Sequence, residues 1–147
     1  MPIINGLITA EGPVIDVVIW VSNPRYQALK KANQPVPPIR RVRALIDTGA
    51  SATAVDSSII QSLGLPATGC EPIHTPSSGA TPAMCNLFDV SISLTDQNRP
   101  HFLKITLPVI EFDLSLLTID ALLGRDVLES CLMNYNGITG QFTLATS

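Results

Sequence analysis

The stretch Ala44-Leu45-Ile46-Asp47-Thr48-Gly49-Ala50-Ser51 decides which fold we expect for this chain. A short apolar run ends in an acid, and a glycine and small residues follow it. A carboxylate at the end of a buried strand loses hydration and needs a partner, so structure alone rarely requires an acid there. The stretch therefore predicts a strand over residues 41–46 that delivers Asp47, as a candidate catalytic acid, to a turn.

The composition predicts one globular domain that spans residues 1–147. Hydrophobic residues make up 46% of the 147 residues and charged residues 14%, which is typical of a chain that buries a core. The formal net charge is −3 and the pI about 5.2. An acidic balance argues against a general nucleic-acid binder, because such proteins use basic charge to displace counterions.

The cysteine pattern and the apolar runs limit the expected cofactors and location. Three widely spaced cysteines do not form a disulfide framework, and the spacing of Cys70, His74 and Cys85 matches no standard zinc motif. We therefore expect no metal and no cofactor. No signal peptide is visible, and the longest apolar run, residues 14–21, is too short to span a membrane. We expect a cytoplasmic protein without a membrane partner.

Local patterns outside the opening stretch indicate mostly strands. Asp56 and Gly64 are suited to begin and end a helix over residues 57–63. Residues 23–40 predict a loop, either a solvated excursion or an arm that binds a partner. The other expected elements are strands over residues 14–22, 87–94, 101–112 and 121–124, a short helix over 125–131 and a hairpin over 132–144.

A single carboxylate at Asp47 suggests chemistry that needs a second one. Two carboxyl groups about 3 Å apart cannot both ionise, so they share a proton and can act as general acid and base on a water. The chain has one Asp-Thr-Gly triplet. A two-fold homodimer would supply the second acid. In such a dimer the Thr48 hydroxyl can bond across the axis, and Gly49 leaves room for a substrate backbone.

A second motif supports this interpretation. We call residues 44–51 the first box and this second motif the second box. Ala121-Leu122-Leu123-Gly124-Arg125-Asp126 follows the opening stretch by about 70 residues. With these two boxes the chain resembles the retropepsin-like aspartic proteases over about residues 14–144. The resemblance implies a mostly-β acid-protease barrel with one or two short helices, and a flap hairpin over residues 72–88. It implies a homodimer that acts on peptide or protein substrates.

The resemblance also implies roles for individual residues. Asp47 would be the catalytic acid, and Thr48, Gly49, Gly124 and Arg125 would support its loop. The residues that would contact substrate are Ala50, the flap-tip residues Ser77, Ser78, Gly79 and Ala80, and Leu122, which would line a pocket beside the loop. Asp120 is either a turn acid or the edge of that pocket.

One departure concerns the partner of Arg125. In the viral enzymes an acid often stands two places after the triplet glycine and pairs with this arginine, whereas Ser51 stands there in this chain. Asp126 and Glu129 are the nearby candidates. We expect an aspartic endopeptidase that prefers apolar residues beside the cleaved bond. The alternative is a non-catalytic module that uses the same fold for dimerisation or peptide binding.

Overall fold

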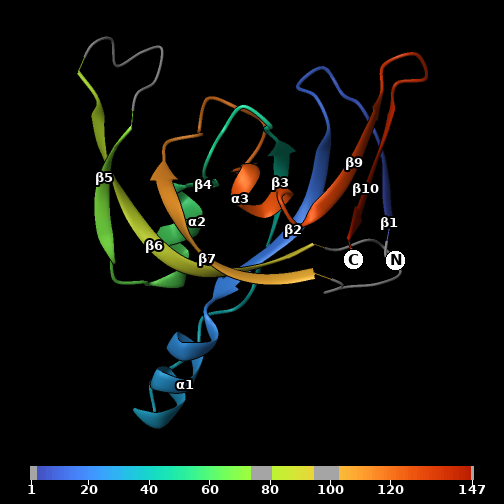
Figure 1. Cartoon of the computed structure of the whole chain (residues 1–147). Coiled ribbons are helices and arrows are strands. Elements are labelled where there is room, and N and C mark those ends of the chain that lie inside the picture. Colours follow the sequence, from blue (N-terminus) through green and yellow to red (C-terminus); the bar gives the residue numbers. More distant parts are fainter. Residues whose placement is uncertain (1–2, 74–80, 95–102, 147) are drawn as a thin grey trace.

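The computed structural model describes residues 3–73, 81–94 and 103–146, and strands dominate these ranges (Figure 1). Within them no helix is long and apolar enough to cross a membrane. In chain order the elements are β1 (Ile3–Leu7), β2 (Val14–Val21), α1 (Asn23–Lys31), β3 (Arg40–Ile46), β4 (Ala54–Asp56), α2 (Ser57–Leu63), β5 (Gly69–Ile73), β6 (Ala83–Leu94), β7 (Leu103–Phe112), β8 (Ala121–Leu123), α3 (Arg125–Leu128), β9 (Cys131–Asn136) and β10 (Gln141–Thr146).

Six strands close into a barrel, which confirms the predicted mostly-β architecture. The order is β2-β3-β8-β4-β7-β6, and β6 pairs back onto β2. The barrel is mixed, because β3–β8 and β4–β7 run parallel and the other neighbours run antiparallel. β5 continues the sheet beyond β6 as a hairpin. A closed barrel leaves few free strand edges and encloses one core.

Alternating and continuous apolar residues of these strands fill the barrel. β2 and the second half of β6 are buried on both faces over much of their length. The sequence of β2 is nearly continuously apolar, whereas in β6 the apolar residues alternate with the buried Ser91 and Ser93. The largest fully buried side chains are Phe142, Ile19, Ile60, Ile92, Leu94, Leu123, Leu144, Val17, Val21, Val55, Val90 and Val109.

A second, three-stranded sheet stands beside the barrel in the order β1-β10-β9. β9 and β10 form the predicted C-terminal hairpin. No strand was expected over residues 3–7, where the pair Asn5-Gly6 is one often found in turns. The structure explains the glycine: a Cβ at Gly6 would lie 2.5 Å from the Phe142 ring, so Gly6 lets that ring pack on the strand.

Helix α2 begins and ends where the sequence predicts. Asp56 caps its first turn by accepting a hydrogen bond from the Ser58 N–H (3.1 Å). Gly64 ends the helix with φ of 60°, a left-handed conformation that glycine adopts without strain. Asp56 also accepts from the Leu114 N–H at 2.7 Å, so one buried carboxylate ties α2 to the segment that follows β7.

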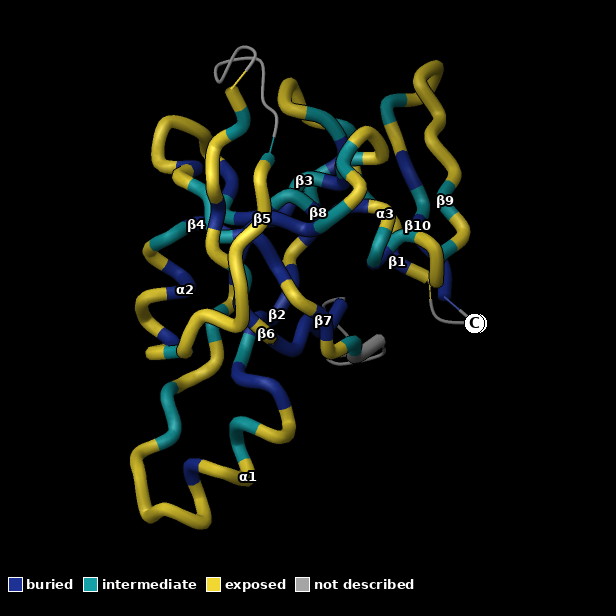
Figure 2. Tube along the Cα trace, turned by 60° about the vertical axis from the view of Figure 1, so that its left-hand side comes forward, coloured by how far each residue is buried: buried dark blue, intermediate teal, exposed yellow. Residues whose placement is uncertain are grey.

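The prediction of a loop over residues 23–40 was wrong for its first half, which forms α1. Asn23-Pro24 reads as a turn signal, but proline is also favoured in the first turn of a helix, where no partner for its nitrogen is needed. Ser22 supplies the cap by accepting from the Arg25 N–H at 3.3 Å. Figure 2 shows that α1 and the irregular segment over residues 32–39 project from the barrel and are mostly exposed.

We predict that Asp56→Asn lowers the free energy of unfolding by about 1–2 kcal/mol at neutral pH, because a charged cap becomes a neutral one. Burial raises the pKa of Asp56, but hydrogen bonds from Ser58 and Leu114 outweigh it and hold the pKa below its ordinary value of 3.8. The stabilisation from this carboxylate is therefore present above pH 3.8 and is lost as the pH falls through the lower, folded-state pKa.

Urea denaturation at several pH values measures this difference. The difference in the free energy of unfolding between the parent chain and Asp56→Asn should become smaller below about pH 4. The exposed Asp89 on β6 offers a matched control, and Asp89→Asn should leave stability within about 0.5 kcal/mol. If the loss of unfolding free energy in Asp56→Asn did not change with pH, the stabilisation could not come from the ionised Asp56 carboxylate.

Candidate active site

Asp47 stands directly after β3, where the parallel pairing with β8 ends. Ile46 lies opposite Leu123, and the Asp47 N–H donates to the Leu123 carbonyl at 2.9 Å. Pairing with β8 therefore fixes the backbone of the acid itself. The Asp47 side chain is half-buried.

The turn after Asp47 closes around its carboxylate. The Gly49 N–H donates to Asp47 Oδ1 at 3.0 Å, and the Ala50 N–H donates to the Asp47 carbonyl at 3.2 Å. A Cβ at Gly49 would lie 3.3 Å from Oδ1, which is tight, so glycine lets the backbone approach the acid. Among the described residues none donates to Oδ2, which leaves that oxygen for a water or a second carboxyl group.

Arg125 braces this turn from the second box. Its Nη1 donates to the Thr48 carbonyl at 2.9 Å, and its backbone N–H donates to the Ala50 carbonyl at 2.9 Å. A backbone carbonyl is thus the partner that the sequence left open, in place of the suggested Asp126 or Glu129. Guanidinium geometry suits this contact, because its donors are held in a fixed plane.

Asp126 instead binds Thr53, and sequence reasoning missed this pair. Thr53 is fully buried, and its hydroxyl donates to Asp126 Oδ1 at 2.7 Å while its N–H donates to Oδ2 at 2.9 Å. The Thr53 hydroxyl also accepts from the Gly124 N–H at 3.1 Å. Each of these polar groups has a hydrogen-bond partner. The network therefore makes the site more rigid and leaves no buried charge unsatisfied.

Gly124 is required where the two boxes cross. A Cβ on this residue would lie 2.6 Å from the Ala52 carbonyl carbon and 2.7 Å from its oxygen. Both neighbours are backbone atoms and cannot rotate away. The residue thus acts by its small size, since its φ of −88° is ordinary for any amino acid.

The remaining predicted site residues lie in three places. Leu122 is half-buried and packs, with Ala52 and the hairpin residue Ile73, against a small apolar cluster that is separate from the main core. Asp120 lies at the start of β8, away from Gly124, and its Oδ2 accepts from the Arg43 N–H at 3.1 Å. The arms of the hairpin, β5 and β6, are present with Ile73 opposite Ala83. Its predicted tip, Ser77, Ser78, Gly79 and Ala80, lies outside the described residues.

Comparisons with known proteins bear on the family and on the fold of this chain. A family model described as aspartyl protease matches residues 33–127, which include both boxes. The chain is similar in structure to a retropepsin-like aspartic protease from Rickettsia conorii, with a TM-score of 0.59 and 18% identity over 97% of this chain and 90% of that one. It is also similar to the EIAV protease in complex with the inhibitor HBY-793, with a TM-score of 0.44 and 17% identity over 80% and 85%.

A comparison with curated proteins finds no match. The predicted retropepsin-like fold is confirmed by the Rickettsia structure and by the family match.

We predict that Gly124→Ala destabilises the chain by about 3 kcal/mol, because the new methyl group overlaps the Ala52 backbone and the two boxes must separate. Thermal or urea unfolding measures the loss. Gly137 is the matched control: a Cβ there would lie 3.6 Å from the Tyr135 ring, an ordinary contact, so Gly137→Ala should change stability by less than about 1 kcal/mol. If the two substitutions had equal effects on stability, overlap with the Ala52 backbone would not be the reason for glycine at position 124.

Proposed function

The chain belongs to the aspartyl protease family, and from this premise we propose that it is an endopeptidase whose catalytic dyad consists of Asp47 from two identical chains. The observation that carries the proposal is the braced turn. Its carboxylate is held on one oxygen by Gly49, and the Gly124–Arg125 box fixes the turn from behind. A general acid–base group needs this combination of fixed position and one accessible oxygen.

In the proposed reaction the two carboxyl groups hold one proton between them. The ionised group takes a proton from a water, whose oxygen attacks the peptide carbonyl carbon. The protonated group donates to the carbonyl oxygen. Transfer of a proton to the amide nitrogen then breaks the C–N bond and releases the amine. Thr48 would bond across the dimer axis, and Gly49 and Ala50 would contact the substrate backbone.

An apolar surface next to the turn supports apolar specificity. Ala52, Ile73 and Leu122 come from the catalytic turn, the hairpin and β8, and all three pack against the same small cluster. Phe112 and Leu87 complete its partly buried rim. A peptide that lies in extended form between the hairpin and the turn would place apolar side chains on this surface.

The β1-β10-β9 sheet supports the homodimer. Its three strands contain no Asp, Glu, Lys or Arg, although charged residues make up 14% of the chain. Pairing places Ile3, Ala145 and Leu132 in one row across the sheet, and Ile3 and Leu132 are exposed. Depletion of charge together with exposed apolar residues is typical of an interface.

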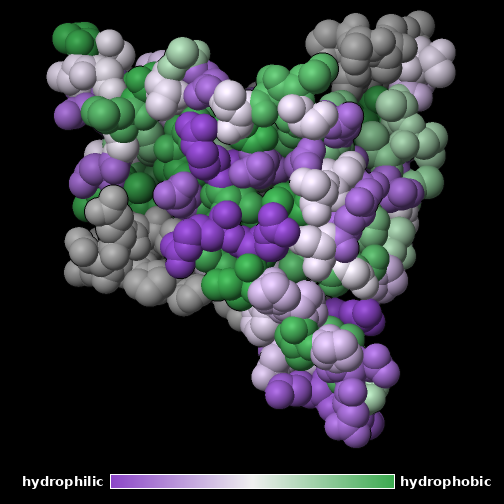
Figure 3. All heavy atoms as spheres, turned by 180° about the vertical axis from the view of Figure 1, so that it is seen from behind, coloured by the Kyte–Doolittle hydropathy of each residue, from purple (hydrophilic) through white to green (hydrophobic). Residues whose placement is uncertain are grey.

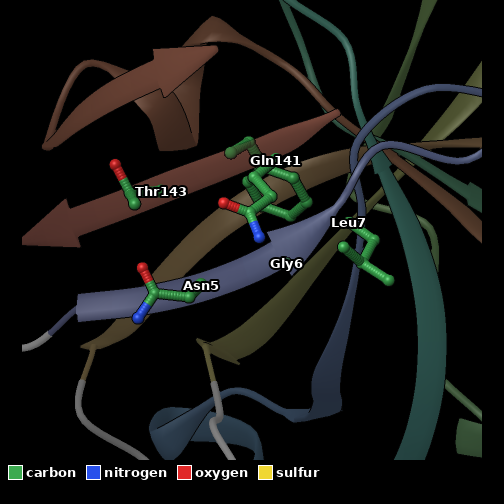
Figure 4. A pocket seen from close by; sticks show the side chains of 6 residues that line it. Asn5, Gly6, Leu7, Gln141 and Thr143 are labelled. Carbon is green, nitrogen blue, oxygen red and sulfur yellow. The ribbon is translucent and has the colours of Figure 1, made fainter. Parts of the chain in front are cut away.

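A shallow cavity of about 330 Å³ lies on β1 and β10 of this sheet (Figure 4). Figure 4 shows the amide groups of Asn5 and Gln141 and the Thr143 hydroxyl along it, with Leu7 at one side. Such neutral groups both donate and accept hydrogen bonds, so the same surface on a second chain can complement it about a two-fold axis.

We predict that Asp47→Asn lowers cleavage of an unfolded protein substrate at least about 1,000-fold across pH 3–8, because neither chain then has a carboxylate that can take a proton from water. Circular dichroism and sedimentation should show an unchanged fold and dimer. Asp89→Asn is the matched control and should retain activity. A statine-type inhibitor should block the parent activity. Full activity of Asp47→Asn would remove Asp47 from the mechanism, and a dimer that cleaves nothing would favour the non-catalytic alternative.

We predict that Leu132→Asp weakens dimerisation at least about tenfold, because a charge in an uncharged interface is desolvated without a partner. Analytical ultracentrifugation measures the dissociation constant, and cleavage should become dependent on protein concentration. Leu116 is 98% exposed in the segment after β7, so Leu116→Asp is the control and should have no effect. A dimer unchanged by Leu132→Asp would exclude this face.

A further inference from the structure

Charge is unevenly distributed along the chain. Residues 17–46 contain six of the nine Lys and Arg residues and none of the twelve Asp and Glu residues. This stretch therefore carries a formal charge of +6 and the remainder −9, which together give the net charge of −3. Five of the six basic residues belong to residues 22–41, which we name the basic arm: Arg25, Lys30, Lys31, Arg40 and Arg41.

The basic arm is built as a fixed projection. Trp20 Nε1 donates to the Pro37 carbonyl at 2.7 Å, which ties the proline-rich return to β2. The rings of Trp20 and Tyr26 lie 5.3 Å apart, and Lys30 Nζ lies 5.8 Å from the Tyr26 ring centroid. In Figures 1 and 2 α1 projects from the end of the barrel opposite the carboxyl end of β3, so the arm and the catalytic turn face different sides.

Only part of the arm's charge stabilises its own fold. Lys30 and Lys31 lie in the last turn of α1, where the helix dipole favours cations. α1 has no acid in its first turn, where the helix dipole favours one, and has Arg25 there instead. Among the described residues the ion pair joins Arg43 to Glu11, at 3.9 Å, and no carboxylate pairs with the five basic residues of the arm. The surface of the arm is mainly hydrophilic (Figure 3). Arg25 stands at the end of α1 where the helix dipole disfavours a cation, so an external anion offers a reason to keep a basic residue there.

A groove of about 400 Å³ lies between the arm and the end of α2. Arg25 and Leu29 of α1 and residues 35–38 form one wall, and residues 61–64 form the other. Arg25 Nε is buried and has no hydrogen-bond partner within the described part of the chain. The last turn of α2 faces the same groove, and the final carbonyls of a helix lack intrahelical donors. The groove thus brings the Arg25 cation beside the carboxyl end of α2, where the Gln61 carbonyl already accepts from the Gly64 N–H.

We propose that the basic arm binds an extended acidic segment of a protein substrate, at a distance from the cleaved bond. That the bound protein is a substrate rests on the proposed function. A peptide offers carboxylates for the basic side chains and N–H donors for the α2 carbonyls, whereas a nucleic-acid backbone offers mainly acceptors. α1 exposes no large apolar side chain, so it lacks the anchor of a membrane-surface helix.

The positions of the basic residues indicate how the segment lies. Arg25 lines the groove, whereas Lys30 and Lys31 are exposed in the last turn of α1. Residues five apart on an α-helix point about 140° away from each other, so Arg25 and Lys30 lie on different faces of α1. A segment that reaches both therefore places one carboxylate at Arg25 in the groove and a later one, beyond the groove, near Lys30 and Lys31.

The test uses the Asp47→Asn chain, so that binding is measured without cleavage. A fluorescein-labelled peptide of about twelve residues with Glu at alternate positions is titrated by fluorescence anisotropy, beside a matched peptide with Gln. We expect the Glu peptide to bind at least about tenfold more tightly at low salt, and to lose this advantage at about 0.5 M NaCl. Lys30→Gln with Lys31→Gln should weaken binding about fivefold, and Arg25→Gln about tenfold.

Two controls separate specific binding from net charge. Arg43→Gln removes a charge that Glu11 and the Thr118 carbonyl already occupy, and should change affinity less than about twofold. Lys30→Arg with Lys31→Arg should retain binding. Equal binding of the two peptides, equal loss with Arg43→Gln, or tighter binding of an RNA oligomer or anionic vesicles would overturn the proposal. A parent chain that binds the Glu peptide but cleaves no protein substrate would contradict the proposed function and would still support the acidic-peptide site.

Discussion

The structure depends on the close crossing of two chain segments, residues 44–53 and 121–126. Parallel pairing of β3 with β8 brings Asp47 beside Leu123, and the absence of a side chain at Gly124 lets the second segment lie on the Ala52 backbone. Neither segment could approach the other in this way if residue 124 carried a Cβ. The rigidity of the candidate catalytic turn follows from this contact.

The polar residues at the crossing have different roles. Asp126 is bound on both oxygens by Thr53, and Arg125 binds a backbone carbonyl, so neither needs the other. Within the described ranges, Asp47 accepts hydrogen bonds on one carboxylate oxygen only. An acid that is fully satisfied rigidifies the fold, whereas an acid with a free oxygen remains available for chemistry. Two aspartates that look alike in the sequence therefore have different tasks.

Charge separates the surfaces in the same way. The β1-β10-β9 sheet has no charged residue, the basic arm has five basic residues and no acid, and the rest of the chain is acidic. An uncharged face suits a permanent partner, because no ion must be desolvated, whereas a basic projection suits a partner of opposite charge that comes and goes. The proposed dimer and the proposed acidic segment thus use different faces and different forces.

The sequence by itself determined five of the six barrel strands, α2 with both of its caps, and the two boxes, because each follows from local periodicity or from a residue with special backbone properties. It did not determine β4, which has three residues and pairs with β7 and β8 from distant parts of the chain. It did not determine β1, whose pairing depends on Phe142 at the far end of the chain, or α1, whose first residues serve equally in a turn. Nor could it identify which of several neighbouring hydroxyls, Thr48, Ser51 or Thr53, becomes buried against Asp126. Only the tertiary structure decided these points, because they depend on contacts between residues that lie far apart along the chain or on the choice between two local conformations of similar energy.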